Sequence, residues 1–109
     1  MKTIYSIAAA PIIINVSLSL IAAYFLGNTE KIPMHWNTNW QVNLYAPKFV
    51  GLSIIPLVSI FALVSFLLSN HLKKESQQIR DVAIIGLILV SSHIFHLYLI
   101  KQWFAAQSS

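Results

Sequence analysis

The sequence contains no cysteine and few charged residues. Without cysteine, its 109 residues can form neither a disulfide nor a thiolate metal site. Only 9% of the residues are charged and 57% are hydrophobic, whereas roughly 25% of an ordinary soluble domain is charged. A chain this small has a large surface for its volume, and so few charges cannot cover it in water. The composition therefore favours a single domain that resides in a membrane.

Acidic residues and catalytic motifs are also scarce. The three carboxylates are Glu30, Glu75 and Asp81, and none lies within an apolar run. The sequence lacks the HExxH pair of zinc proteases, the nucleophile elbow of hydrolases and a phosphate-binding glycine loop. We therefore predict a protein that is not an enzyme and has no cofactor. A simple ion pump is disfavoured as well, because the apolar runs contain no carboxylate.

What the sequence does have is three long apolar runs, each long enough to cross a ~30 Å hydrocarbon layer as a helix. The predicted transmembrane helices cover residues 4–26, 49–69 and 82–100. The first is predicted to be retained rather than removed as a signal peptide, because no polar region with a cleavage site follows it. Residues 70–81 are predicted to form a loop and residues 105–109 a short tail. The expected fold is an all-α membrane protein with one domain over residues 1–109.

Small and weakly polar residues recur on one face of the first predicted helix, at three- and four-residue steps. They are Ala8, Pro11, Asn15, Ser19 and Ala22. Such a face allows close packing between helices in lipid, where the hydrophobic effect cannot drive association. We expect Asn15 to make a hydrogen bond to another helix. In the second helix, Pro56 is expected to cause a kink because it lacks a backbone donor.

The polar segment between the first two runs, residues 28–48, is rich in aromatic residues. Trp36, Trp40 and Tyr45 suit the headgroup layer of a membrane, where an amphipathic ring is half wet. Pro33 favours an extended backbone at the residue before it. We expect the segment to lie along the membrane surface.

The basic residues divide unevenly between the two sides of the predicted membrane domain. One side carries four of them: Lys2, Lys73, Lys74 and Arg80. The other side carries three: Lys31, Lys48 and Lys101. By the positive-inside rule, this pattern puts the N-terminus in the cytoplasm and residues 28–48 outside. The basic residues are too scattered to indicate nucleic-acid binding.

Two histidines, His93 and His96, fall inside the third predicted helix, where ionisable groups are costly. They are three residues apart and share a helical face, in the half of the helix nearer the side that carries His35. One hypothesis is that they hydrogen-bond within the bundle, to Asn15, Ser92 or backbone carbonyls. The other is that His35, His93 and His96 converge as metal or haem ligands or as a proton relay.

The polar segment also contains a recognisable pattern, formed by Pro33, His35, Trp36, Asn37, Asn43 and Lys48. It resembles an uncharacterised bacterial membrane domain that also forms the N-terminal part of the SdpI family, immunity proteins against a sporulation-delay toxin. That family carries approximately Ile/Leu-Pro-x-His-Trp/Phe-Asn-x-x-Gly-x-x-Asp and then a lysine, between its first two transmembrane helices. The likeness extends over roughly residues 4–70.

Two positions depart from the family pattern. Trp40 stands where the family has a glycine, which would serve a tight turn that a tryptophan makes less comfortable. Asn43 stands where the family has an aspartate, so Lys48 loses a charge partner and His35 loses a carboxylate partner. The resemblance implies a protein of the bacterial plasma membrane, with a role in immunity or signalling.

Three functional hypotheses follow. The first is a small non-enzymatic membrane protein that contacts the bilayer and a protein partner, either a toxin or a signalling protein. The second is a membrane protein that binds a metal or haem through the three histidines. The third is a transporter or channel component assembled as a homo-oligomer, since three helices are few for a substrate pathway.

Overall fold

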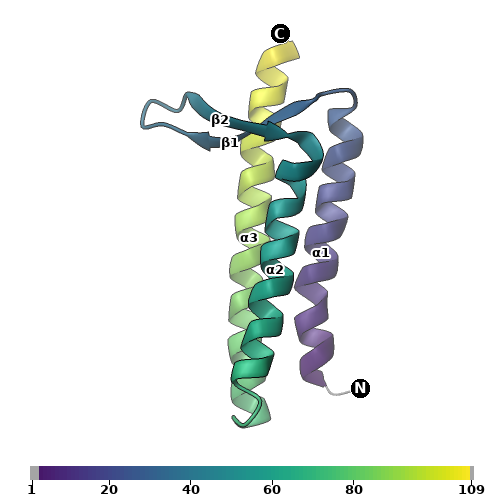
Figure 1. The fold of residues 1–109 in the computed structure, drawn as a ribbon, viewed down its shortest axis with the longest axis vertical. Helices are drawn as coiled ribbons and strands as arrows, with labels where there is room; N and C mark the ends of the chain where they lie inside the picture. The colour runs from purple at the N-terminus through teal and green to yellow at the C-terminus, as the bar shows by residue number, and fades with distance from the viewer. Residues whose placement is uncertain (1–2, 109) are drawn as a thin grey trace.

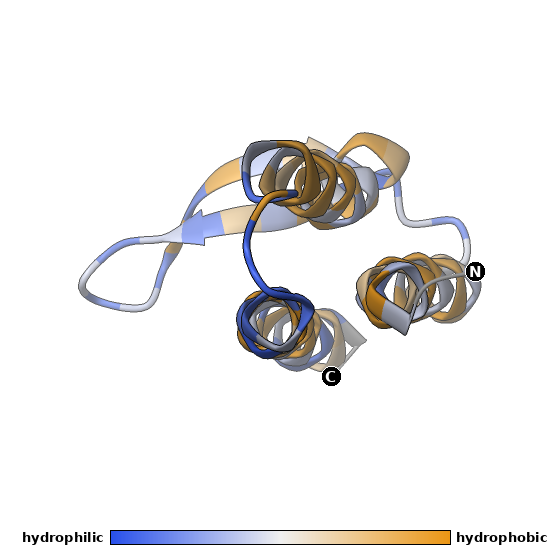
Figure 2. Ribbon diagram, turned by 90° about the horizontal axis from the view of Figure 1, so that it is seen from below, coloured by the Kyte–Doolittle hydropathy of each residue, from blue (hydrophilic) through white to orange (hydrophobic). Residues whose placement is uncertain are grey.

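The computed structural model describes residues 3–108 and contains three long helices and one β-hairpin (Figure 1). In chain order the elements are α1 (Thr3–Leu26), β1 (Lys31–Trp36), β2 (Val42–Pro47), α2 (Lys48–Ser69) and α3 (Glu75–Ser108). The helices run side by side along the long axis of the molecule, and the hairpin crosses the end of the bundle opposite the start of α1 (Figure 1). Seen along that axis, the hairpin projects to one side, beyond the helices (Figure 2).

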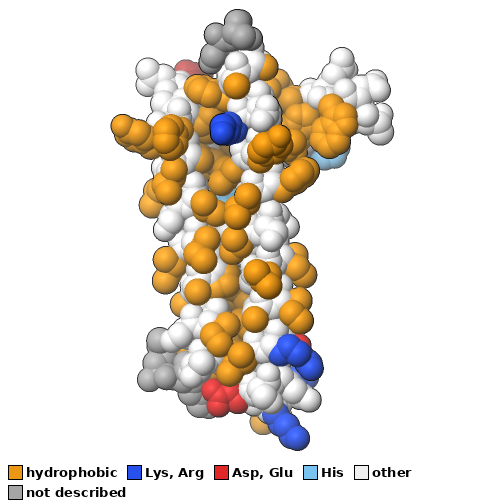
Figure 3. All heavy atoms as spheres, turned by 180° about the vertical axis from the view of Figure 1, so that it is seen from behind, with side chains coloured by type: hydrophobic (Ala, Val, Ile, Leu, Met, Phe, Trp, Pro, Cys, Tyr) orange, Lys and Arg blue, Asp and Glu red, His pale blue; other side chains and the backbone are white. Residues whose placement is uncertain are grey.

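All three helices are long and apolar enough to cross a membrane. Most of their large apolar side chains point outward rather than into the bundle. Figure 3 shows these side chains along the length of the bundle, with lysine and arginine side chains toward its two ends. Such a surface is suited to lipid and unsuited to water. The architecture is therefore that of a multi-pass membrane protein.

The first two predicted spans are confirmed within a residue or two at each end, whereas the third is too short. Helix α3 begins at Glu75 and continues to Ser108. The prediction of a loop over residues 70–81 and a tail over residues 105–109 was therefore wrong for most of both segments. Glutamate, glutamine and arginine are good helix formers, and Glu75 lies in the first turn, where the helix dipole favours an acid. The apolar run marks only the part of a helix that suits lipid, not its full length.

The all-α prediction is correct for the spans and wrong for residues 28–48. Strands β1 and β2 pair antiparallel, with Lys31 opposite Pro47 and Trp36 opposite Val42. Proline is tolerated here because a two-stranded sheet consists of edge strands only. Ile32 and Pro33 of β1 are buried, and Ile32 lies against Gly51 of α2, while β2 is mostly exposed. The hairpin therefore has one side that packs on the bundle.

Helices α1 and α3 approach closely where Gly86 meets Pro11. A Cβ atom placed on Gly86 would lie 2.5 Å from Cγ of Pro11, so no larger residue fits without movement. The predicted small-residue face of α1 is confirmed, since Ala8, Pro11, Asn15 and Ser19 are among its buried residues. The interior of the bundle is therefore built from small and polar side chains as well as apolar ones.

Candidate functional site

Two groups of residues make up the candidate site. The hairpin site consists of Pro33, His35, Trp36, Asn37, Trp40, Asn43 and Lys48. The bundle network consists of Asn15, Ser19, Ser59 and His93, which are buried between the helices. His96 links the two groups, because it lies on α3 and contacts the hairpin.

Asn37 builds the tip of the hairpin. Its side-chain Oδ1 accepts hydrogen bonds from the backbone N–H groups of Asn39 and Gln41, each at 2.9 Å. Its own backbone N–H donates to the Gln41 carbonyl at 2.9 Å, and its carbonyl accepts from the Trp40 N–H at 3.0 Å. Asparagine side chains commonly close turns in this way. The motif asparagine is thus explained by the shape of the turn.

Trp40 takes a backbone conformation that a glycine, the residue of the resembled motif at this position, adopts more easily. Its φ angle is +59°, in the left-handed region, and it is the only non-glycine residue with positive φ among residues 3–108. A side chain in this region costs free energy because Cβ crowds the backbone. The prediction of a tight turn that is uncomfortable for Trp40 is confirmed. The residue is 68% exposed at the tip.

His35 and Asn43 pair across the hairpin. His35 Nδ1 lies 2.7 Å from Asn43 Oδ1, so the imidazole donates to the amide oxygen. An irregularity in the strand register next to His35 sets it opposite Leu44 and brings Asn43 within reach. An aspartate at position 43 would offer the same acceptor with a charge. Compared with the aspartate of the resembled motif, Asn43 lacks the charge and still accepts the hydrogen bond.

Lys48 joins the start of α2 to the end of α1. It is 9% exposed, and its ammonium donates to the Gly27 carbonyl at 2.5 Å. The same ammonium lies 4.8 Å from the centroid of the Phe49 ring. A cation is favoured beside the carbonyls that end a helix, because these carry the negative end of the helix dipole. Lys48 thus gives a hydrogen-bond partner to the Gly27 carbonyl, just after the end of α1 and before the hairpin begins.

His96 fastens the hairpin to α3. Its Nε2–H donates to the Pro33 carbonyl at 3.1 Å, and its ring meets the Trp36 ring edge-on at 6.1 Å. A second edge-on pair, Tyr45 with Trp103, lies at 6.1 Å. His96 thus bonds to a backbone carbonyl, as one hypothesis expected, but the carbonyl belongs to the hairpin and not to the bundle.

Ser19 is the centre of the bundle network. Its hydroxyl donates to the Leu52 carbonyl at 2.6 Å. In a regular helix that carbonyl would accept from residue 56, but Pro56 has no N–H. Ser19 Oγ also lies 2.8 Å from His93 Nε2. Because the single hydroxyl proton goes to Leu52, the histidine must be the donor, which leaves Nδ1 of the neutral ring as an acceptor.

Asn15 makes the second link between α1 and α2. Its Nδ2 donates to Ser59 Oγ at 2.9 Å, and Ser59 donates in turn to the Ile55 carbonyl at 2.8 Å. The predicted interhelical hydrogen bond of Asn15 is confirmed. Within residues 3–108, Asn15 Oδ1 and His93 Nδ1 are the two buried side-chain atoms without a hydrogen-bond partner. Both are acceptors.

The three histidines do not come together as a ligand set. His35 is held by Asn43, His93 by Ser19 and His96 by Pro33. Among residues 3–108, no group of three or more His, Cys, Asp or Glu side chains is arranged to hold a metal ion. His93 is held by a serine that the hydrogen-bonding hypothesis did not include. The signal that could have found Ser19 is Pro56, which leaves the carbonyl four residues earlier in need of a donor.

Comparison with known families gives one match. Residues 7–60, just under half of the 109 residues, match a family described as a domain of unknown function (DUF1648). The matched stretch runs from α1 through the hairpin into α2, and it contains every residue of the hairpin site. No curated protein and no solved structure matches the chain. The match agrees with the resemblance of the motif to an uncharacterised domain. It carries no information on toxin immunity.

Proposed function

We propose that this membrane protein, whose residues 7–60 match a domain of unknown function, is a non-enzymatic protein that binds another protein through its hairpin. The partner is a toxin that acts on the cell envelope or a signalling protein of the same membrane. The protein resides in the bacterial plasma membrane, with its N-terminus in the cytoplasm and the hairpin outside. The four-to-three division of basic residues supports this orientation.

The observation that carries the proposal is the projecting hairpin. Its tip extends beyond the helices (Figure 2), and the hairpin exposes large side chains: Trp40 at the tip is 68% exposed, and Leu44 in β2 is 57% exposed. Its base is held by the contacts of His96, Trp103 and Lys48, so the tip is presented in a defined position. Exposed aromatic residues on a preorganised element are favourable for protein binding.

The chemistry of the motif supports a binding role over catalysis. The polar side chains of the motif are engaged with one another or with the backbone: Asn37 in the turn, His35 with Asn43, and Lys48 with Gly27. A hydrolase needs a nucleophile beside a base, or a metal-bound water. The motif residues hold the shape of the hairpin, and this role matches a recognition surface.

The test is a toxin-challenge assay in cells that express the wild-type protein, a hairpin variant or no protein. Purified peptide toxins that act on the bacterial envelope serve as probes, and the readout is the minimal inhibitory concentration. The hairpin variant is Trp40→Asn, because asparagine tolerates a positive φ and removes the ring without straining the turn. Loss of one anchoring aromatic side chain is expected to lower protection about tenfold.

The matched control is Leu72→Ser, which changes an exposed apolar residue (89% exposed) at the opposite end of the bundle. It should protect as well as the wild type. The proposal fails if cells without the protein are as resistant as cells with it and if the expression of neighbouring genes is also unchanged. Equal protection by the wild type and Trp40→Asn would show that the tip is not the binding surface.

A further inference from the structure

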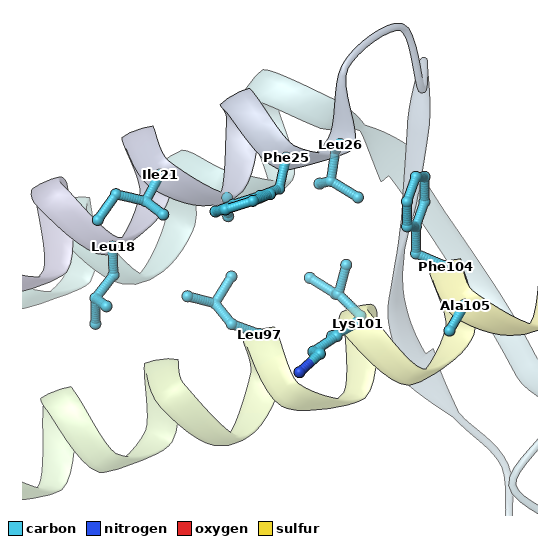
Figure 4. Close-up of a pocket in the computed structure, with 10 residues that line it drawn as sticks. Leu18, Ile21, Phe25, Leu26, Leu97, Lys101, Phe104 and Ala105 are labelled. Carbon is cyan, nitrogen blue, oxygen red and sulfur yellow. The ribbon is translucent and has the colours of Figure 1, made fainter.

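An apolar groove of about 630 Å³ runs between α1 and α3, at the end of the bundle that carries the hairpin. Residues from both helices form its walls, among them Leu18, Ile21, Phe25, Leu97, Lys101 and Phe104. Figure 4 shows the α1 side chains facing those of α3 across this space. From Leu18 to Leu26 the α1 wall extends ~12 Å along the helix axis, at ~1.5 Å per residue. The groove is thus elongated in the direction of the helices.

Lys101 is the one charged residue in the lining of this groove. Its side chain is exposed, and within residues 3–108 its ammonium makes no hydrogen bond or ion pair. Figure 4 shows the side chain emerging from α3 beside Leu97. The groove therefore combines a long apolar surface with one unpaired cation.

The position of Lys101 along α3 puts that cation at the edge of the hydrocarbon layer. Between Arg80 and Lys101, the sequence of α3 contains one charged residue, Asp81, next to Arg80. At ~1.5 Å per residue, Arg80 and Lys101 are ~31 Å apart along the axis, which is the thickness of the hydrocarbon core of a bilayer, ~30 Å. If Arg80 lies at one headgroup layer, Lys101 lies at the other.

We propose that the groove binds an anionic phospholipid, with an acyl chain between α1 and α3 and the phosphate on Lys101. An acyl chain runs parallel to membrane-spanning helices, as the groove does, and its surface matches the apolar walls. The unpaired cation in the groove lining, Lys101, selects a lipid with net negative charge over a zwitterionic one. Bilayer lipids surround this face of the bundle, so no further partner is needed to fill it.

The test uses the full chain reconstituted into vesicles that contain equal amounts of phosphatidylglycerol and phosphatidylcholine. The protein is extracted with a mild detergent, and native mass spectrometry counts the lipids that remain bound. The expected result is one retained phosphatidylglycerol per chain, in preference to phosphatidylcholine. Lys101→Gln should reduce that preference about fivefold, the effect of one lysine near an anionic surface, whereas Lys101→Arg should keep it.

Lys73→Gln is the matched control, because Lys73 is exposed in the turn at the opposite end of the bundle. It should leave the preference unchanged. Filling the groove with Ala22→Phe should lower the retention of both lipids, with circular dichroism showing that the helices persist. Equal retention of the two lipids, or an unaltered preference in Lys101→Gln, would overturn the proposal. Recovery of a lipid-free dimer would overturn it too, since a second copy would then cover the groove.

Discussion

The helix bundle and the hairpin contain similar hydrogen bonds in opposite surroundings. Asn15, Ser59 and His93 are almost completely buried, and their side-chain bonds join different helices. The bonds of His35 and Asn37 are exposed and lie within the hairpin. In the bundle no water can replace a lost partner, whereas at the hairpin tip it can. The bundle network should therefore determine stability, and the hairpin bonds should determine local shape.

The largest effect in this comparison is expected for Ser19→Ala. The change removes the donor to the Leu52 carbonyl and the acceptor for His93. Each buried group left without a partner costs about 1–3 kcal/mol, so the free energy of unfolding should fall by about 3 kcal/mol. Unfolding in mixed micelles with increasing denaturing detergent measures it. Ser53→Ala is the control, because Ser53 bonds only to the Val50 carbonyl of its own helix.

The Pro56→Ala background tests the reason for that effect. Alanine supplies the backbone N–H that proline lacks, so the Leu52 carbonyl no longer needs Ser19. Ser19→Ala should then cost about 1 kcal/mol less than in the wild type, a coupling measured by the double-mutant cycle. An identical cost in both backgrounds would mean that the Leu52 carbonyl is not the reason for the serine.

The next largest effect is expected where helix packing is tight. Gly86→Ala places a methyl group against the ring of Pro11, which cannot move aside easily. Overpacking of this kind costs about 1–3 kcal/mol, and the better helix propensity of alanine returns up to ~1 kcal/mol. We expect a net loss of about 1.5 kcal/mol in the same unfolding assay. Ala83→Val adds bulk on the exposed face of α3 and should change little.

A smaller and local effect is expected at the hairpin tip. Asn37→Ala removes the oxygen that accepts from Asn39 and Gln41, which should open the turn at a cost of about 1 kcal/mol. Hydrogen exchange should accelerate at those two amides while the amides of α1 and α3 exchange as before. Asn39→Ala is the matched control, since its side chain is not the acceptor in the turn. Destabilisation of the whole bundle would contradict the division between the two regions.

The smallest effect is expected for Trp40→Gly, and it has the opposite sign. Glycine relieves the positive φ of residue 40, worth about 1 kcal/mol, but loses more chain entropy on folding. The turn should gain about 0.5 kcal/mol, seen as slower exchange of the Gln41 amide. Trp40→Val should speed that exchange, because a β-branched residue is poorly tolerated at positive φ. Faster exchange in Trp40→Gly would show that contacts of the ring stabilise the turn.

The membrane spans could be predicted because they depend on local composition. An apolar run must be helical in lipid, since the helix satisfies its own backbone groups. Residues 75–81 were not predicted to be helical, because they are largely polar and continue α3 beyond the apolar run. The hairpin was missed for a different reason. Strand pairing is non-local, and the turn from Asn37 to Gln41 lacks the Asn-Gly or Asp-Gly pair that marks a short hairpin.

For the candidate site, too, the sequence allowed some features to be predicted and not others. The motif residues and the intramembrane histidines could be identified from the sequence, as could the strain at Trp40. Their partners could not, because a hydrogen bond such as Ser19 to His93 joins residues 74 positions apart. The alternative hypothesis, in which His35, His93 and His96 converge, does not match the structure of residues 3–108, since a shared side of the membrane does not give a shared site.

The sequence by itself determined three helices that are long and apolar enough to cross a membrane, with a polar segment between the first two. The reason is that an apolar chain in lipid must satisfy its backbone groups within a helix. Only the tertiary structure decided that the polar segment is a hairpin fixed by His96, and that Ser19 fills the gap that Pro56 leaves in α2. It also decided that Lys101 lies beside an apolar groove. The reason is physical: composition selects the surroundings of a segment, whereas the partner of each polar group depends on how the helices pack.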